Sequence, residues 1–405
     1  MPASSANKSL LLYEPRTEGH HLGWLRFITE DLLSAGYQLT LAVDLRPAGL
    51  SKVQEHLGPL AREVQFLSAY TPDGQNCGGA GAQSVAFCLE DSGAPNVFLC
   101  ALDEVSSPVL RHAAFGLMPP RTLQGHWGGI CHRPRFLEPA RGSLNGWLKT
   151  LGFRRLVKQG WFRQIVLLDE YLARERQPAF PGAPFFFLPG PCPAEPPGDR
   201  REACRQLGIP EDKRVFLFFG VGSKRKGLHL AVQAMLQFKE SGAFLLCAGQ
   251  LRPEPAVQAG LQQLEKVGRA KILDRYVSTA EEKWCFAACD VVLLPYLDHF
   301  GTSAVLFQAA AARRPVIASD EQLLGRLVKD HDLGLLFESG EVASLIQSLQ
   351  TATAWDAEFM TRRTRALETF SARYSRAAYR EALLTALTQP QTKSCGPAGT
   401  TSRGK

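Results

Sequence analysis

The chain has 405 residues, about twice the length of an ordinary single domain, so its length predicts two domains. Hydrophobic residues make up 45% and charged residues 21%, a balance that is typical of folded globular proteins and excludes an intrinsically disordered chain. There are 46 lysines and arginines against 39 aspartates and glutamates; this formal charge of +7 favours an anionic partner, either a phosphate-bearing small molecule, a lipid surface or nucleic acid.

Several classes of protein are excluded by what the sequence lacks. No run of about 18 apolar residues predicts a transmembrane helix. The polar N-terminus lacks the apolar core and cleavage site of a secretory signal. The ten cysteines form no CxxC pair and have no zinc-ligand spacing, so small buried residues are the favoured interpretation. We therefore expect a cytoplasmic protein with reduced cysteines, no bound metal and no cofactor.

The first half of the chain alternates strand and helix signals. An apolar strand at 9–13 is followed by helical spacing from Leu22 to Leu33, a stop at Gly36 and a second strand at 38–43. This βαβ opening predicts a parallel sheet. The further strands that we expect in this half lie at 63–67, 97–102, 121–124 and 165–168.

A proline-rich stretch near the midpoint predicts a linker, since 181–197 contains seven prolines. The alternation then restarts, with strands expected at 215–219, 243–248, 271–273, 291–295 and 315–319, a helix at 227–239, and a capping box, Ser278 to Glu281, that begins another helix. We expect a domain at 1–190, a second at 191–355, a helical segment at 356–388 and a disordered tail at 389–405.

The clearest local signal is the turn Phe218-Phe219-Gly220-Val221-Gly222-Ser223-Lys224-Arg225-Lys226-Gly227. An apolar strand ends in glycines, and three cations precede a helix. Glycines allow close backbone approach to an anion, and a helix N-terminus adds free N–H groups and partial positive charge. The turn is neither a dinucleotide fingerprint nor a P-loop. It predicts a diphosphate site, with a solvated basic turn as the alternative.

A second signal follows the expected strand at 291–295. There His299-Phe300-Gly301-Thr302-Ser303 opens an alanine-rich helix, which leaves backbone amides and two hydroxyls for phosphate oxygens. Simple N-capping is the alternative. Both signals follow strands of one parallel sheet, and ligands bind at the carboxyl ends of such strands.

These residues carry a family resemblance. The second half resembles the donor-binding domain of family-4 glycosyltransferases, which have the two-domain GT-B fold. The matching segments are the glycine turn after the strand with Arg225-Lys226-Gly227, Ala248-Gly249, 286–296, 301–303, 308–311, 314–319 and 333–337. The resemblance implies an α/β fold of two Rossmann-like domains facing across a cleft.

The resemblance also implies a nucleotide-sugar donor. Arg225 and Lys226 would hold the diphosphate and stabilise the leaving group, and the turn at Gly222 and the amides of Gly301, Thr302 and Ser303 would complete the phosphate site. The family has two glutamates eight positions apart. The later aligns with Gln308, which can still bind ribose hydroxyls, and the earlier aligns with Phe300, beside His299, which would contact the sugar.

The first domain would then hold the acceptor. Gly19 would let the backbone approach the donor phosphate, and His126, in a loop that we expect after a strand, would act on the acceptor side, with a buried structural histidine as the alternative. The remaining polar candidates are Glu18, His20, His21, Asp103, Glu104, His132 and Arg133.

One further segment, 141–163, contains six cations, no acid and four interleaved aromatic residues. This pattern suits peripheral contact with an anionic bilayer at the inner face of a membrane, with core packing of the aromatic residues as the alternative. No helix-turn-helix, RRM or zinc pattern predicts nucleic-acid binding.

The resemblance as a whole implies a glycosyltransferase that moves a hexose from a nucleotide-diphosphate sugar to an unidentified acceptor with retention. Because Phe300 and Gln308 replace the two glutamates, an inactive glycosyltransferase-like binding protein remains an alternative, as does a nucleotide-sugar epimerase of the same fold.

Overall fold

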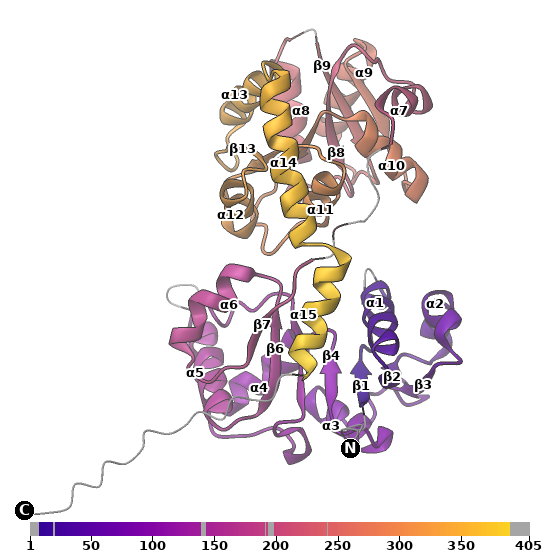
Figure 1. Ribbon diagram of the computed structural model, residues 1–405, viewed down its shortest axis with the longest axis vertical. Helices are drawn as coiled ribbons and strands as arrows, with labels where there is room; N and C mark the ends of the chain where they lie inside the picture. The colour runs from indigo at the N-terminus through magenta and orange to yellow at the C-terminus, as the bar shows by residue number, and fades with distance from the viewer. Residues whose placement is uncertain are drawn as a thin grey trace, which may run out of the picture. The chain divides into compact units, whose positions relative to one another are not determined.

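The computed structural model describes residues 8–18, 21–138, 143–190, 192, 198–240 and 242–388. These residues form two compact units (Figure 1). Unit 1 contains the described residues up to Leu188 and returns at Arg380, and unit 2 runs from Pro189 to Tyr379. The disordered tail predicted at 389–405 lies outside the described residues, as do Gly19, His20 and part of the proline-rich stretch.

Unit 1 is built on a parallel sheet whose described strands have the order β3-β2-β1-β4-β5-β6-β7. The strands are β1 (Ser9–Tyr13), β2 (Gln38–Val43), β3 (Val64–Ser68), β4 (Val97–Leu99), β5 (Trp127–Cys131), β6 (Phe162–Leu167) and β7 (Phe185–Phe187). The helices are α1 (His21–Ser34), α2 (Pro47–Leu57), α3 (Ala82–Ser92), α4 (Leu102–Ala114), α5 (Leu144–Lys158) and α6 (Glu170–Arg176), with short 3₁₀ turns η1 (Gly58–Leu60), η2 (Arg121–Leu123) and η3 (Gln177–Ala179).

Unit 2 repeats the same arrangement with the order β10-β9-β8-β11-β12-β13. The strands are β8 (Arg214–Phe219), β9 (Ala243–Ala248), β10 (Ala270–Leu273), β11 (Val291–Leu294), β12 (Val316–Ser319) and β13 (Gly334–Phe337). The helices are α7 (Arg200–Leu207), α8 (Leu228–Gln237), α9 (Pro255–Lys266), α10 (Thr279–Ala288), α11 (Ala304–Ala311), α12 (Gln322–Asp330), α13 (Val342–Thr353), α14 (Ala357–Arg373) and α15 (Arg376–Thr388), with the turn η4 (Lys224–Lys226).

Both sheets have the strand order of a Rossmann fold, and this order decides where ligands bind. The order reverses between β1 and β4 in unit 1 and between β8 and β11 in unit 2. At such a switch point the loops that follow the two strands diverge, which leaves room for a ligand at their carboxyl ends. The two loops singled out from the sequence of the second half follow β8 and β11.

The strands are apolar because parallel sheets are covered on both faces. In β8, Phe216 and Phe218 are buried in the core of unit 2 with apolar side chains of α8, α9 and α13. Each such phenylalanine contributes on the order of 2 kcal/mol by leaving water. This packing fixes the strand whose end carries the basic turn.

Most sequence-predicted strands are present within a residue or two, and the capping box is formed, with Ser278 and Glu281 bonding each other's backbone. One strand prediction is wrong: 121–124 forms the turn η2, and the strand lies at β5 instead. The helical segment expected at 356–388 is divided into α14 and α15, and the second ends in unit 1. At the break, the Tyr374 carbonyl accepts a hydrogen bond of 2.6 Å from the Cys192 N–H.

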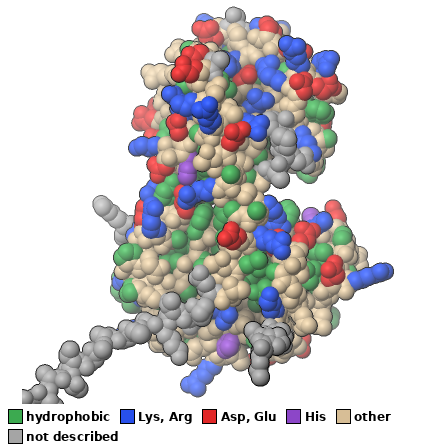
Figure 2. All heavy atoms as spheres, viewed as in Figure 1, with side chains coloured by type: hydrophobic (Ala, Val, Ile, Leu, Met, Phe, Trp, Pro, Cys, Tyr) green, Lys and Arg blue, Asp and Glu red, His purple; other side chains and the backbone are tan. Residues whose placement is uncertain are grey.

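On one face of the molecule, charged residues form no single patch (Figure 2). On the face shown in Figure 2, lysine and arginine side chains alternate with acidic ones in both units. On this face (Figure 2) the excess of positive charge is therefore not concentrated over one element.

Candidate functional site

The basic turn after β8 is fixed at both ends by backbone contacts. Gly222 pairs with the loop after β9, because its N–H donates to the Gln250 carbonyl at 2.8 Å and its own carbonyl accepts from the Arg252 N–H at 2.8 Å. Gly227 adopts φ +70°, and a Cβ there would collide with the Pro295 carbonyl. Glycine is thus required at 227 both by conformation and by space.

The loop after β11 lies directly against this turn. The Leu297 N–H donates to the Arg225 carbonyl at 2.8 Å, which joins the two loops through their backbones. Further along, Asp298 has φ 48° and Gly301 has φ 98°, so the loop turns sharply before α11 begins. A Cβ at Gly301 would meet open space. The two loops predicted from the sequence therefore form one cluster at the switch point of the second sheet.

His299 links the two loops through its side chain. Its Nδ1 lies 3.1 Å from Arg225 Nη1, and its Nε2 lies 3.3 Å from the Thr302 carbonyl. A guanidinium donates only and a carbonyl accepts only, so Nδ1 accepts and Nε2 carries the proton. This tautomer directs the Arg225 guanidinium toward the loop that opens α11.

Lys226 is the second cation of the cluster and is half-buried. Its Nζ lies 5.4 Å from the centre of the Tyr296 ring. Burial, with a smaller contribution from the charge of Arg225, lowers the pKa of Lys226 below the usual value for lysine. A partly desolvated ammonium beside a guanidinium is an arrangement that a bound anion would stabilise.

Ser303 does not offer its hydroxyl as the sequence led us to expect. The residue is 3% exposed, and its Oγ donates to the buried Tyr296 hydroxyl at 3.3 Å. Burial in turn raises the pKa of Tyr296 to about 12. Of the two hydroxyls, the half-buried Thr302 retains access to a ligand.

Gln308 lies one turn inside α11, and its partner was not foreseen. Its Nε2 donates to Glu282 Oε1 in α10 at 2.6 Å, and burial raises the pKa of that carboxyl. Sequence reasoning missed Glu282 because only the fold brings it to Gln308. Phe300 is half-buried in the preceding loop. The assignment of 300 and 308 to the two-glutamate motif remains a prediction.

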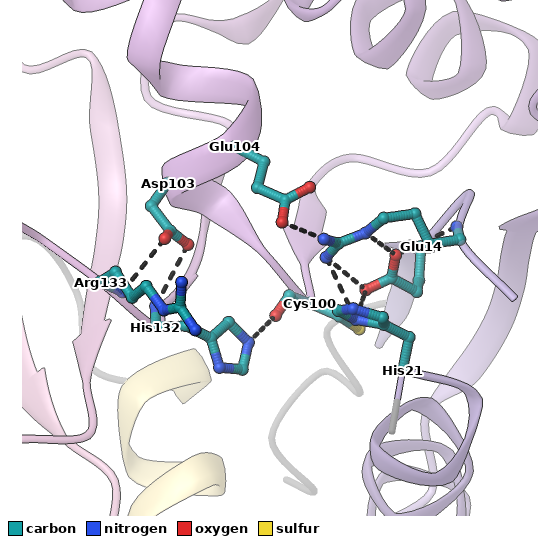
Figure 3. A network of polar contacts seen from close by, with 8 residues as sticks. Glu14, His21, Cys100, Asp103, Glu104, His132 and Arg133 are labelled. Atoms are coloured by element: carbon teal, nitrogen blue, oxygen red, sulfur yellow. Dashed lines mark hydrogen bonds and ion pairs between the residues drawn. The ribbon is translucent and has the colours of Figure 1, made fainter. Parts of the chain in front are cut away.

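Unit 1 carries a separate polar network at the switch point of its own sheet (Figure 3). The carboxylate of Glu14 is 1% exposed, and it pairs with Arg16 at 3.1 Å and with His21 at 3.2 Å. The Asp103 carboxylate accepts the backbone N–H groups of His132 and Arg133, each at 3.1 Å. These residues follow β1, β4 and β5, so several acceptor-side candidates lie at the carboxyl edge, as their positions predicted.

His126 lies elsewhere in unit 1. It precedes β5, and its Nδ1 lies 2.9 Å from the Pro95 carbonyl, which precedes β4. The expected loop after a strand is therefore wrong, because the segment before it is the turn η2. His126 is at the amino ends of the strands, opposite the edge that carries the network of Figure 3. Gly19 lies outside the described residues.

The basic and aromatic segment at 141–163 is largely part of the core. Phe153, Trp161 and Phe162 are buried, while Leu144 and Trp147 at the start of α5 are 70% and 57% exposed. The exposed cations Arg154, Arg155 and Lys158 lie on the same helix. No helix within the described ranges is long and apolar enough to cross a membrane.

The fold and the loop cluster define a class of protein. The chain has the GT-B fold of two Rossmann-like domains, and it is similar over nearly its whole length to solved structures of that class. A sucrose-phosphate synthase from Thermosynechococcus elongatus superposes with a TM-score of 0.67 at 15% identity, covering 94% of this chain and 98% of that one. The Anabaena protein HepE, in complex with UDP and glucose, gives 0.65 at 16% identity, covering 94% and 99%.

Sequence comparison points to the same class. Residues 199–359, about two fifths of the chain, match the profile of the glycosyl transferases group 1 family. A D-inositol 3-phosphate glycosyltransferase from Nocardioides is 28% identical over 178 residues, which are 40% of this chain and 38% of that protein. The chain thus spans well under half of the curated relative that it matches. Together these matches show that the chain has the GT-B fold and that its second unit is similar to glycosyl transferases group 1.

Proposed function

We propose that the protein transfers a hexose from a nucleotide-diphosphate sugar to an acceptor hydroxyl, with retention of configuration. The observation that carries the proposal is the joining of the loops after β8 and β11, which places Arg225 and Lys226 beside the opening of α11. Two cations and a helix N-terminus form a charge arrangement suited to a diphosphate. The family profile covers both loops.

The chemistry follows from where charge develops. When the bond between the sugar and the diphosphate breaks, negative charge grows on the departing phosphate oxygens. Arg225 and Lys226, already in place, would stabilise that charge, with the amides of Gly301 and Thr302 donating to other phosphate oxygens. Preorganised charge of this kind lowers the barrier because no reorganisation is needed during the reaction. In the proposed reaction, the acceptor oxygen attacks on the face from which the diphosphate leaves.

The acceptor would bind at the polar network of unit 1. Glu14 is held between Arg16 and His21, and the Asp103 carboxylate fixes the backbone of His132. Such preorganised polar groups suit an acceptor with several hydroxyls. Substitution of His132 by alanine should raise the KM for the acceptor and leave the affinity for the nucleoside diphosphate unchanged.

Thermal shift with UDP, GDP and ADP, followed by hydrolysis and transfer assays with the matching sugar nucleotides, tests the proposed activity. Stabilisation by one diphosphate and release of that diphosphate from its sugar nucleotide support it. Binding without turnover under any acceptor mixture would favour the inactive binding protein. No stabilisation by any diphosphate would remove the basis of the proposal.

We also propose that the first turn of α5 contacts an anionic lipid surface, because Leu144 and Trp147 are exposed on this helix, which carries cations and no acid. Co-sedimentation with liposomes of anionic lipid is the test, with Trp147→Ala as the variant and neutral liposomes as the control. Equal sedimentation of the wild type with both kinds of liposome would reject the contact.

A further inference from the structure

Glu282 and Gln308 form a pair on two neighbouring helices of unit 2. Besides the contact of 2.6 Å between Gln308 Nε2 and Glu282 Oε1, the Arg314 side chain donates to the carbonyls of Phe286 at 3.0 Å and Ala287 at 2.6 Å. The first turn of α10 thus contacts the middle of α11, and the last turn of α10 contacts the segment that follows α11. Both helices follow carboxyl ends of strands, so the pair lies at the edge that carries the phosphate cluster.

The contact fixes the orientation of the Gln308 amide. An ionised carboxylate accepts hydrogen bonds and does not donate them, so the amide nitrogen must point to Glu282. The amide oxygen then points away from Glu282. Within the described part of the chain, neither side chain makes a further side-chain hydrogen bond. The pair therefore presents two acceptor oxygens, Gln308 Oε1 and Glu282 Oε2.

The position of the pair matches the geometry of a nucleotide. Gln308 is one helical turn from Ala304, the first residue of α11, a separation of about 6 Å along the axis. A ribose is joined directly to the first phosphate of a nucleoside diphosphate. A diphosphate at the opening of α11 would thus have its ribose near this turn.

The Gln308 amide satisfies one carboxylate oxygen of the half-buried Glu282, and the other oxygen is not sealed from solvent, so a ligand can reach it. A ligand with two adjacent hydroxyl donors would satisfy both unused acceptors. The other residues of α11 that are not buried are Ala304 and the half-buried Ala311, whose side chains are small.

We propose that Glu282 is a specificity-determining residue: together with Gln308 it accepts hydrogen bonds from the two ribose hydroxyls, and so selects ribonucleoside over 2′-deoxyribonucleoside diphosphates. This inference rests on the proposed function of the same site. It adds a residue from α10 that lies outside both loops and acts on the nucleoside rather than on the phosphates.

The test compares two affinities of the 405-residue chain, one for a ribonucleoside diphosphate and one for its 2′-deoxy counterpart. Calorimetric titration of the wild type with UDP, GDP and ADP identifies the nucleotide that binds, and its 2′-deoxy counterpart should bind on the order of 10-fold more weakly. Glu282→Gln keeps the shape and removes the charge, and it should bring the ratio close to one. Inorganic pyrophosphate, which has no ribose, should bind the wild type and the variant equally.

Two further variants test whether a change in the affinity ratio is due to the pair of Glu282 and Gln308. Glu265→Gln makes the same substitution on the exposed side of α9 in the same unit and should leave the ratio unchanged. Gln308→Leu removes the partner and should also lower the ratio, which keeps the test valid where Glu282→Gln folds poorly.

The outcomes separate the two proposals. An unchanged ratio in both Glu282→Gln and Gln308→Leu, with nucleotide binding retained, overturns the ribose assignment and leaves the proposed function standing. Equal loss of pyrophosphate binding in Glu282→Gln also overturns it, because the residue would then act on the phosphates. Absence of binding by every diphosphate in the wild type overturns both.

Discussion

The backbone N–H of Leu297 donates a hydrogen bond of 2.8 Å to the backbone carbonyl of Arg225. The two residues are far apart in the sequence, and each lies in the loop that follows a strand at the switch point of the second sheet. Because the contact is between backbones, it fixes the position of Arg225 whatever its side chain is. Substitutions of the two cations should therefore act through charge and leave the loops in place.

Arg225→Ala and Lys226→Ala should each reduce sugar-nucleotide turnover on the order of 10²–10³-fold, because each removes a charge that stabilises the leaving diphosphate. Lys224→Ala is the matched control, since Lys224 is an exposed cation of the same turn, and it should change turnover little. Steady-state release of the nucleoside diphosphate measures both. Turnover that is unchanged in the double variant Arg225→Ala/Lys226→Ala would contradict the assignment.

Lys226→Met should make the folded protein more stable and should at the same time abolish binding of pyrophosphate. The pKa of Lys226 is lowered in the folded protein, so between that value and the ordinary value the unfolded chain binds more protons and stability rises with pH. At neutral pH the buried charge is thus destabilising, and its removal should raise the Tm by about 2–4 °C while pyrophosphate binding is lost.

The pH dependence of this stability difference provides a check. Tm values of the wild type and Lys226→Met, measured from neutral pH up to the ordinary pKa of lysine, should converge as pH rises. A difference that stays constant over this range would show that packing, and not charge, distinguishes the variant.

Two glycine substitutions should lower the free energy of unfolding by different amounts. Gly227→Ala meets both a positive φ and the Pro295 carbonyl, so it should lower the free energy of unfolding by about 3 kcal/mol or more. Gly301→Ala meets open space, and only its conformation opposes it, at about 1–2 kcal/mol. Urea denaturation of the two variants compares them directly. Equal costs would mean that the loop after β8 shifts away from Pro295 without loss.

Binding of the nucleoside diphosphate should weaken in acid because of Glu282. Burial raises the pKa of this carboxyl, so protonation occurs at a higher pH than for an exposed glutamate and removes its acceptor charge. Since the phosphates also titrate, the comparison is between the wild type and Glu282→Gln at each pH. The affinity difference should shrink as pH falls, and a difference independent of pH would argue against an ionised Glu282.

His126→Ala should leave turnover within about twofold of the wild type, because His126 is at the amino ends of the strands, away from the edge where ligands bind. His132→Ala, at the carboxyl edge, is the comparison. A loss of more than 10-fold in His126→Ala alone would restore the role that the sequence led us to expect.

The sequence made the second unit easier to predict than the first. The strands β8, β9 and β11 are unbroken apolar runs that end at glycine or proline, so their ends and the loops after them were predictable. In contrast, β5 contains Gly128 and Gly129, and this pair of glycines predicts a loop. A Cβ at Gly128 would collide with the Gln164 backbone in β6, so close strand packing demands the glycine, and such packing has no signature in a single sequence.

Contacts between side chains of distant segments were the second feature of the site that the sequence could not predict. Position 308 was singled out by resemblance, whereas its partner Glu282 was not, because only the fold brings this residue of α10 to α11. The burial of the Ser303 hydroxyl against Tyr296 likewise depends on the curvature of a loop with two positive φ angles. Local spacing predicts which loop carries a function, while tertiary packing decides which of its atoms are accessible.

The return of α15 to unit 1 has a consequence for the order in which the protein matures. Leu383 and Leu387 near the end of α15 are buried, and the Leu387 carbonyl accepts a hydrogen bond of 3.4 Å from Arg163. During synthesis, unit 2 is complete in sequence before these residues emerge from the ribosome. Unit 1 is translated first but therefore completes its packing last. A truncation that removes α15 would leave unit 1 without this helix.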